Sequence, residues 1–64
     1  MTKRPHFEIR LSKSIEFYFV LVAPNGEVIL VSQMYDTIDG CEKGIRSVKR
    51  NALIARTDDM TKKK

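Results

Sequence analysis

Cysteine and histidine are scarce in this sequence, and their scarcity limits the sites that the chain can carry. Its 64 residues include one cysteine, Cys41, and one histidine, His6. A lone cysteine excludes a disulfide within the chain, and with it a secreted disulfide framework. One cysteine and one histidine are also too few for a zinc site within one chain. We expect neither a metal ion nor a cofactor.

Long apolar runs are missing too. No apolar segment approaches the roughly 20 residues that a membrane span requires, and residues 1–5 lack the apolar stretch of a signal peptide. The glycines do not form a phosphate-binding loop, since Gly26 falls in a predicted hairpin and Gly40 and Gly44 fall in a predicted helix. We therefore expect a cytoplasmic protein without a membrane partner.

Residue types that serve catalysis are present without the arrangement that catalysis needs. Cys41 has no base near it and lies on an apolar helical stripe, which predicts a buried, inert thiol. Asp58 and Asp59 are adjacent, so on a strand they face opposite sides. His6 lies at the edge of the first predicted strand, where we expect a surface position. We predict no catalytic residues and no enzymatic activity.

The length of the chain allows one domain, which we place at residues 1–64, with an ordered core at about 6–61 and a basic tail at 62–64. A domain of this size buries only about 60% of the surface that its unfolded chain exposes, so its stability is marginal. Because neither a disulfide nor a metal ion can stabilise it, we expect the chain to be stabilised by association with a second copy of itself.

Three segments have the pattern of β-strands: residues 6–11 alternate between apolar and polar, and residues 16–23 and 27–33 are rich in apolar and β-branched side chains. A turn at Pro24-Asn25-Gly26 joins the second to the third. A three-residue loop with a bulge at Gly26 would pair Leu21 with Ile29. A two-residue turn would shift the register by one and place Val28 and Leu30 inside, and the sequence leaves both registers open.

The second strand is apolar on both faces. One face carries Phe17, Phe19 and Leu21, and the opposite face carries Tyr18, Val20 and Val22. If the helix covers the first face, the second is an exposed apolar surface. We therefore assign Tyr18, Val20 and Val22 as a face for ligand binding or for further association.

A helix is predicted to begin at Asp36 or Thr37 and to end near Asn51. Within it, Glu42 and Arg46 are one turn apart and can form a weak ion pair. Small residues flank its apolar face and would allow another backbone to approach closely; these are Gly40, Gly44, Ser47 and Asn51. The apolar face itself follows a helical period through Ile38, Cys41, Ile45, Val48 and Ala52. Residues 55–60 then form a predicted fourth strand.

The net charge of +4 is concentrated at the two ends of the chain and on the predicted helix. Four basic residues of the helix are candidate contacts for nucleic acid, since phosphate neutralisation requires little more than such a patch. The ordinary alternative is a solvated helix face, which Asp39 and Glu42 partly balance. The four are Lys43, Arg46, Lys49 and Arg50.

In combination, several groups of residues resemble the YegP-like family of small bacterial domains. The resemblance covers about residues 7–61, and its residues are Asn25 to Ile29, Ser32, Tyr35, Gly40 to Ile45, Ser47 to Ala52, Asp59 and Thr61. It implies a β-β-β-α-β unit in the α+β class, with an antiparallel sheet and the helix on one face. It further implies that two units share one sheet and exchange their C-terminal strands, which for this chain means a homodimer. Gly40 and Gly44 would then lie against the partner.

The chain departs from the family in its second strand, where relatives carry charged or polar residues at positions 18, 20 and 22. The family supplies no activity and no site residues. We expect a small, non-enzymatic homodimeric module that is structural or binds another protein. The alternative is a nucleic-acid-binding accessory protein that uses the basic helix face, and a small-molecule site on the outer sheet face comes third.

Overall fold

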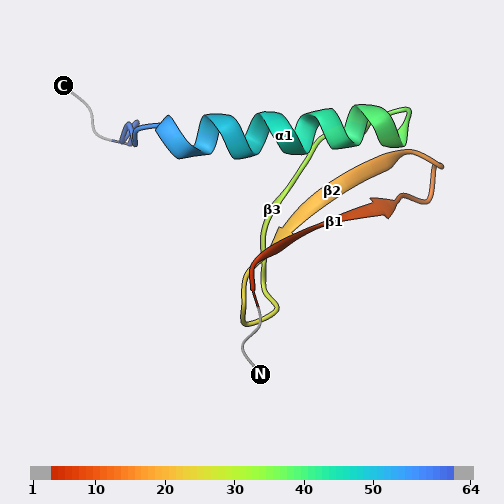
Figure 1. Ribbon diagram of the computed structural model, residues 1–64, viewed down its shortest axis with the longest axis horizontal. Coiled ribbons are helices and arrows are strands. Elements are labelled where there is room, and N and C mark those ends of the chain that lie inside the picture. The colour runs from red at the N-terminus through yellow and green to blue at the C-terminus, as the bar shows by residue number, and fades with distance from the viewer. Residues whose placement is uncertain (1–3, 62–64) are drawn as a thin grey trace.

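The computed structural model describes residues 4–61, and the basic tail predicted at 62–64 lies outside them. Three strands precede one helix: β1 (His6–Leu11), β2 (Phe17–Val22), β3 (Val28–Val31) and α1 (Ile38–Ile54). The strands form one antiparallel sheet in the order β1-β2-β3, and α1 lies across one of its faces (Figure 1). The predicted α+β class is confirmed, and each strand falls within the segment that its pattern indicated.

The pairing of β1 with β2 places apolar residues of both strands on the face that α1 covers. Ile9 lies opposite Phe19, and Phe7 lies opposite Leu21. The ring of Phe7 meets the ring of Phe19 edge-on, with 5.8 Å between their centroids. The alternation within residues 6–11 therefore predicts correctly which side chains of β1 face the helix.

The loop between β1 and β2 holds a β-branched residue in the left-handed region. Ile15 has a φ of 61° and an exposed side chain. Two backbone bonds fix the loop: the Ser12 amide donates to the Glu16 carbonyl (2.8 Å), and the Ile15 amide donates to the Ser12 carbonyl (3.1 Å). A left-handed conformation costs a residue with a Cβ about 1–2 kcal/mol, so this loop is a strained position.

The hairpin between β2 and β3 has the three-residue loop that its sequence indicated, with Gly26 at a φ of 91°. The Ala23 amide donates to the Glu27 carbonyl at 2.8 Å, which closes the loop. The pairing expected beyond it is wrong, because Leu21 lies opposite Leu30 and not Ile29. The register shifts between Leu21 and Val22, so Ile29 is the extra residue of a second bulge.

Beyond β3 the chain stays beside β2 up to the start of the helix. The Ser32 hydroxyl accepts a hydrogen bond from the Phe19 amide at 2.9 Å, a place that a backbone carbonyl takes in a regular ladder. Tyr35 and Phe17 exchange two backbone bonds of 2.7 and 2.8 Å. The ring of Tyr35 then stacks on that of Phe19, with 6.1 Å between centroids. The entry to the helix is therefore fixed to the sheet.

Helix α1 begins after Thr37, whose side-chain oxygen accepts a hydrogen bond from the Gly40 amide at 3.0 Å. Of the two predicted N-caps, Thr37 is the one used. The helix ends at Ile54, and not near Asn51 as predicted. Its last turn packs against little of the described chain, since Leu53 and Ile54 are 86% and 79% exposed. The helix is too short and too polar to cross a membrane.

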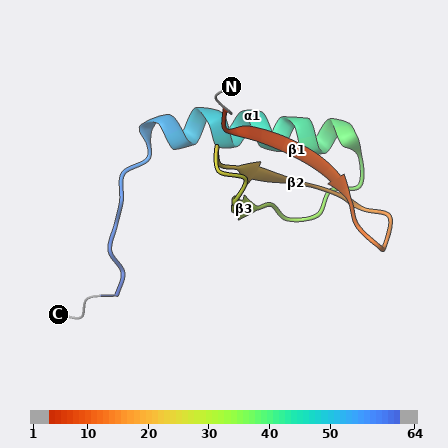
Figure 2. The same cartoon turned by 90° about the horizontal axis from the view of Figure 1, so that it is seen from below.

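The segment after the helix, residues 55–61, lies away from the body of the molecule (Figure 2). The predicted fourth strand at 55–60 is not formed within the described chain. A strand needs a neighbour to receive its backbone hydrogen bonds, and the helix places this segment beyond the reach of its own sheet. The radius of gyration is 14.2 Å, compared with roughly 11 Å for a compact chain of this length.

The core is small. Among the described residues, the buried apolar side chains are Phe19, Val20, Val22 and Cys41. Phe19 lies at its centre, between the rings of Phe7 and Tyr35. Much apolar surface is left uncovered, most of it at the end of α1, in the segment that follows and along β1 and β3.

Candidate functional site

The outer face of the sheet is less open than its sequence indicates. Val20 and Val22 are only 1% and 6% exposed, and Tyr18 is half-buried. In the β1–β2 register these three residues lie opposite Glu8, His6 and Arg10, whose long polar side chains share the face with them. The face that we assigned to ligand binding or association therefore has little apolar surface to offer at Val20 and Val22.

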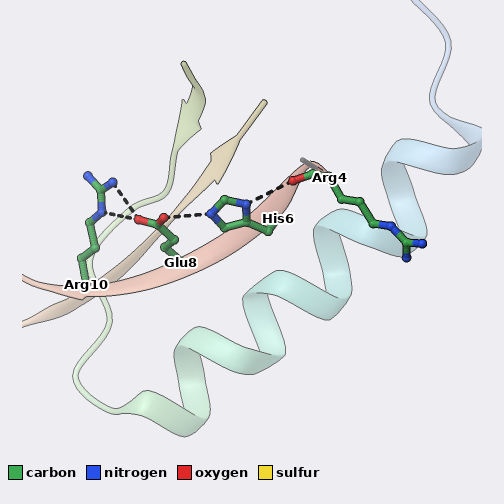
Figure 3. A network of polar contacts seen from close by, with 4 residues as sticks. All are labelled: Arg4, His6, Glu8 and Arg10. Carbon is green, nitrogen blue, oxygen red and sulfur yellow. Dashed lines mark hydrogen bonds and ion pairs between the residues drawn. The ribbon is translucent and has the colours of Figure 1, made fainter. Parts of the chain in front are cut away.

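The polar side chains of β1 form a connected row on this outer face (Figure 3). Glu8 accepts hydrogen bonds from Arg10 at 2.8 and 3.1 Å, and one of its oxygens lies 2.8 Å from Nε2 of His6. Nδ1 of His6 lies 3.3 Å from the carbonyl oxygen of Arg4. The hydrogen bonds from His6 and Arg10 hold the pKa of Glu8 below its ordinary value. His6 is thus part of a polar row and not an isolated edge residue.

The four basic residues of the helix have different surroundings. Arg46 and Lys49 line a groove beside β1. Lys43 lies 3.4 Å from the carboxylate of Asp39, and Arg50 is exposed outside the groove. The ion pair expected between Glu42 and Arg46 is not found among residues 4–61, where neither Arg46 nor Lys49 has a carboxylate within 4.0 Å.

This groove lies between β1 and α1, and we call it the β1–α1 groove. It has a volume of about 650 Å³. Its apolar lining is Phe7, Ile9 and Ile45, and its polar lining is Glu42, Arg46 and Lys49, with Pro5 and His6 at one end. The ammonium group of Lys49 lies 5.6 Å from the centre of the Phe7 ring, a cation–π distance. Such a lining suits an extended segment with both apolar and charged side chains.

The small residues of α1 make room for a side chain of the same chain. A Cβ at Gly44 would lie 2.9 Å from Cζ of Tyr35 and 3.0 Å from a ring carbon of Phe19. At Gly40 the nearest atoms also include the Tyr35 ring, at 3.5 Å. Tyr35 therefore takes the space that we predicted for the partner's backbone. Farther along, the side-chain amide of Asn51 donates to the carbonyl and the hydroxyl of Ser47, at 2.8 and 3.2 Å.

The remaining reactive groups have ordinary surroundings. Cys41 has no exposed surface, and burial raises the pKa of its thiol. Asp59 accepts two hydrogen bonds from Thr61, which lower the pKa of its carboxyl, and Asp58 lies 3.3 Å from Arg56. Within residues 4–61, no three His, Cys, Asp or Glu residues lie close enough together to hold a metal ion.

Sequence reasoning found two residues of the β1–α1 groove, Arg46 and Lys49, and missed its other wall. The alternation of residues 6–11 predicted a strand with one apolar face, but Ile9 on that face is 37% exposed because, among the described residues, no strand pairs with the free edge of β1. The regular alternation of β1 and the helical period were both visible in the sequence. What the sequence does not contain is the strand order, which makes β1 an edge.

Comparison with known proteins places this geometry in a family. Residues 12–59 match a domain described as Domain of unknown function (DUF1508). The chain belongs to the DUF1508 family. The resemblance to YegP-like proteins is thereby confirmed, because the relatives of the chain include the UPF0339 protein YegP of Escherichia coli, 48% identical over 46 residues.

Members of the DUF1508 family differ in length. A UPF0339 protein of Photorhabdus laumondii is 49% identical over 47 residues, which are 73% of this chain and 41% of that protein. The Escherichia coli relative is matched over 72% of this chain and 42% of its own length. A UPF0339 protein of Methanosarcina acetivorans is 50% identical over 50 residues, 78% of this chain and 86% of that protein. The chain thus spans less than half of some relatives and most of another.

One solved structure has the same fold. A solution structure of a protein from Haloferax volcanii superposes with a TM-score of 0.81 at 29% sequence identity. The alignment covers 89% of this chain and 97% of the other. The two proteins therefore share the fold of three antiparallel strands and one helix.

Proposed function

We propose that this DUF1508 unit is a non-enzymatic homodimeric module in which two copies share one antiparallel sheet and exchange their C-terminal segments. The observation that carries the proposal is the apolar surface left uncovered at the end of the chain. Leu53, Ile54 and Met60 are 79–86% exposed, in a domain whose core is small. Apolar side chains gathered in this way are typical of a surface that another protein covers.

The lengths of the relatives support pairing of two units. The 47 residues matched in the Photorhabdus relative are 41% of its length, so that protein has about 115 residues, enough for two units of this size. The 50 residues matched in the Methanosarcina relative are 86% of its length, which gives about 58 residues and one unit. Because some relatives are long enough for two units and another for one, we expect a single unit to assemble in pairs.

The proposed role of the module is structural or protein-binding. Val28, Ile29 and Val31 of the edge strand β3 are exposed and offer apolar surface to a protein partner. A buried free cysteine suits a reducing compartment, and we accordingly place the module in the cytoplasm. We do not propose a small-molecule site on the outer sheet face, because Val20 and Val22 are buried.

Sedimentation equilibrium tests the dimer. The expected result is a species of twice the 7.4 kDa chain mass at micromolar concentration. A variant that ends at Ile54 lacks the segment to be exchanged and should lose this species. A folded, full-length chain that stays at 7.4 kDa up to about 100 μM would contradict the proposal. A dissociation constant above that concentration is too weak for a specific dimer.

Nucleic-acid binding is the second candidate, favoured by Arg46, Lys49 and Arg50. Among the described residues none of the three has a carboxylate partner within 4.0 Å. Fluorescence anisotropy of a labelled mixed-sequence oligonucleotide, measured at two salt concentrations, tests it. Binding that weakens steeply with salt and is lost in Arg50→Glu would support this role, since phosphate contacts release counterions. An absence of oligonucleotide binding at low salt would contradict this role.

A further inference from the structure

The turn between β2 and β3 contains an asparagine that is followed by a glycine. The asparagines of the chain are Asn25 and Asn51, and only Asn25 precedes a glycine, Gly26. Glycine has no Cβ, so its backbone nitrogen can approach the side-chain carbonyl carbon of the residue before it without a steric clash. Asn25 and Gly26 are also exposed to water. These are the requirements for deamidation, a reaction that makes asparagine thermolabile.

Deamidation at this turn needs only water as a reactant. The backbone nitrogen of Gly26 attacks Cγ of Asn25, and the new N–Cγ bond closes a cyclic succinimide. The Cγ–Nδ2 bond breaks, and ammonia leaves with the proton that the Gly26 nitrogen gives up. Water then opens the ring at either of its carbonyl groups, which leaves aspartate or isoaspartate. No group is oxidised or reduced.

The closed turn holds both reacting groups in hydrogen bonds. The Gly26 amide donates to the Ala23 carbonyl at 2.9 Å. The side chain of Asn25 is bound at both ends, since Oδ1 accepts from the Glu27 amide at 3.0 Å and Nδ2 donates to the Glu27 carboxylate at 3.2 Å. Succinimide formation removes the Gly26 N–H and the Nδ2 group, so two of these three bonds are lost on the way to it. The closed turn therefore slows the first step.

Little else holds this end of the hairpin closed. β3 is four residues long, and its register with β2 shifts between Leu21 and Val22, close to the loop. Within the described chain α1 packs on β1 and β2 but not on β3, and the loop lies beyond the end of the sheet, away from α1 (Figure 1). Val28 and Ile29 are 45% and 58% exposed. A segment with so few buried contacts opens locally, at a free energy below that of global unfolding.

We propose that Asn25 is a site of deamidation by water, protected while the turn at residues 24–26 is closed and released when the end of the β2–β3 hairpin opens. A slow reaction of an open state follows the population of that state, so the rate of deamidation measures how often the hairpin opens. The inference goes beyond the proposed module and is independent of the proposed dimer, because the reaction needs one chain and water.

Both products of the reaction alter the turn. Aspartate at position 25 places a second carboxylate beside that of Glu27, where Nδ2 of Asn25 now donates at 3.2 Å, and the hydrogen bond is replaced by repulsion between like charges. Isoaspartate adds an atom to the backbone of the loop, so the bonds that Gly26 and Ala23 make across it no longer fit. Either product loosens β3, which carries the exposed apolar surface offered to a protein partner. Deamidation thus weakens that surface as the protein ages.

Peptide mapping by mass spectrometry tests the proposal. The folded, full-length protein is incubated in mildly alkaline buffer beside a blocked peptide of residues 22–29, which has the same Asn-Gly pair without the fold. Tryptic cleavage after Lys13 and Lys43 releases a fragment in which Asn25 is the only asparagine, and electron-transfer fragmentation distinguishes aspartate from isoaspartate. We expect Asn25 to convert in the protein on the order of tenfold more slowly than in the peptide. Asn25→Gln is the control and should not convert in the same period, because glutamine closes the ring far more slowly.

A variant of the turn tests the dependence on opening. Proline presets the first corner of the turn, so Pro24→Ala should raise the open population and make conversion roughly two- to fivefold faster, while the rate in the matching peptide stays the same. A second measurement uses the wild-type protein in urea below its unfolding transition. There the conversion of Asn25 should rise in proportion to the exchange rate of the Gly26 amide proton.

Three results would overturn the proposal. Conversion as fast in the folded protein as in the peptide would show that the closed turn gives no protection. A rate that follows neither Pro24→Ala nor the exchange of the Gly26 amide proton would show that hairpin opening does not release Asn25. Intact Asn25 in urea that lets Gly26 exchange freely, after the peptide has fully converted, would show the same.

Discussion

A methyl group added at Gly44 has a cost that can be worked out from the structure. The Cβ of Gly44→Ala would lie 2.9 Å from Cζ of Tyr35 and 3.0 Å from a ring carbon of Phe19, and it would be nearer still to the Tyr35 hydroxyl. Neither ring can move away easily, since Phe19 is buried at the centre of the core and Tyr35 exchanges two backbone bonds with Phe17. Overpacking of this kind costs about 1–3 kcal/mol.

Helix propensity opposes this cost. Alanine is favoured over glycine by about 1 kcal/mol inside a helix, so the expected net loss for Gly44→Ala is about 0–2 kcal/mol. In a domain of this size a loss at the upper end of that range lowers the melting temperature by roughly 10–15 °C. Thermal and urea unfolding should be followed at one fixed chain concentration, because the stability of a dimer depends on it.

A companion variant and a double-mutant cycle identify the cause. Gly40→Ala should cost less, since its closest contacts are 3.3 Å to the Thr37 hydroxyl and 3.5 Å to the Tyr35 ring. Tyr35→Phe removes the nearest atom at Gly44, so Gly44→Ala should be milder in that background. If Gly44→Ala stabilises the protein by about 1 kcal/mol, as propensity alone predicts, the close packing of Tyr35 on Gly44 is refuted.

Three further substitutions or conditions have expected outcomes. Ile15→Gly should raise the free energy of unfolding by about 1 kcal/mol, because it relieves the left-handed φ of an exposed residue. A lower free energy of unfolding, measured by urea denaturation, would contradict this. Thr37→Ala should cost about 1 kcal/mol and Thr37→Ser much less, since only the first removes the cap of the Gly40 amide. Burial raises the pKa of Cys41, so the stabilisation linked to its thiol is complete below the unfolded pKa of about 8.5 and is lost as pH rises through the folded value. Cys41→Ala should remove this loss of stability at alkaline pH. A thiol reagent should label Cys41 in the unmodified protein no faster than the fold opens.

Periodicity predicts the parts of this fold that depend on one segment and its two faces. The alternation of β1 and the apolar stripe of α1 could be predicted without knowing which elements lie beside them. The turn at Gly26 follows from the backbone freedom of glycine. The bulge at Ile29 could not be predicted in the same way. It lies between the Val22–Val28 and Leu21–Leu30 pairs, where no turn residue marks it in the sequence.

Errors at the C-terminal end have a common cause. The helix passes the predicted end near Asn51 because Ala52, Leu53 and Ile54 favour a helix and nothing in the sequence stops it. Residues 55–60 were predicted as a strand, but they have no neighbouring strand within the described chain. A strand forms only where the arrangement of the other elements brings a pairing partner within reach. The β1–α1 groove was missed for the same reason.

The packing of Tyr35 against Gly40 and Gly44 affects the motion of α1. The first turns of the helix are held in place, because Thr37 caps them and Tyr35 packs against Gly40 and Gly44. The other end extends past the sheet, and Leu53 and Ile54 are exposed there. Amide protons near Cys41 should therefore exchange slowly and those near Ile54 quickly in a dilute, unpaired chain. As the concentration rises, protection should spread along the helix toward Ile54, so that the last turns of α1 report on assembly while the first turns report on folding.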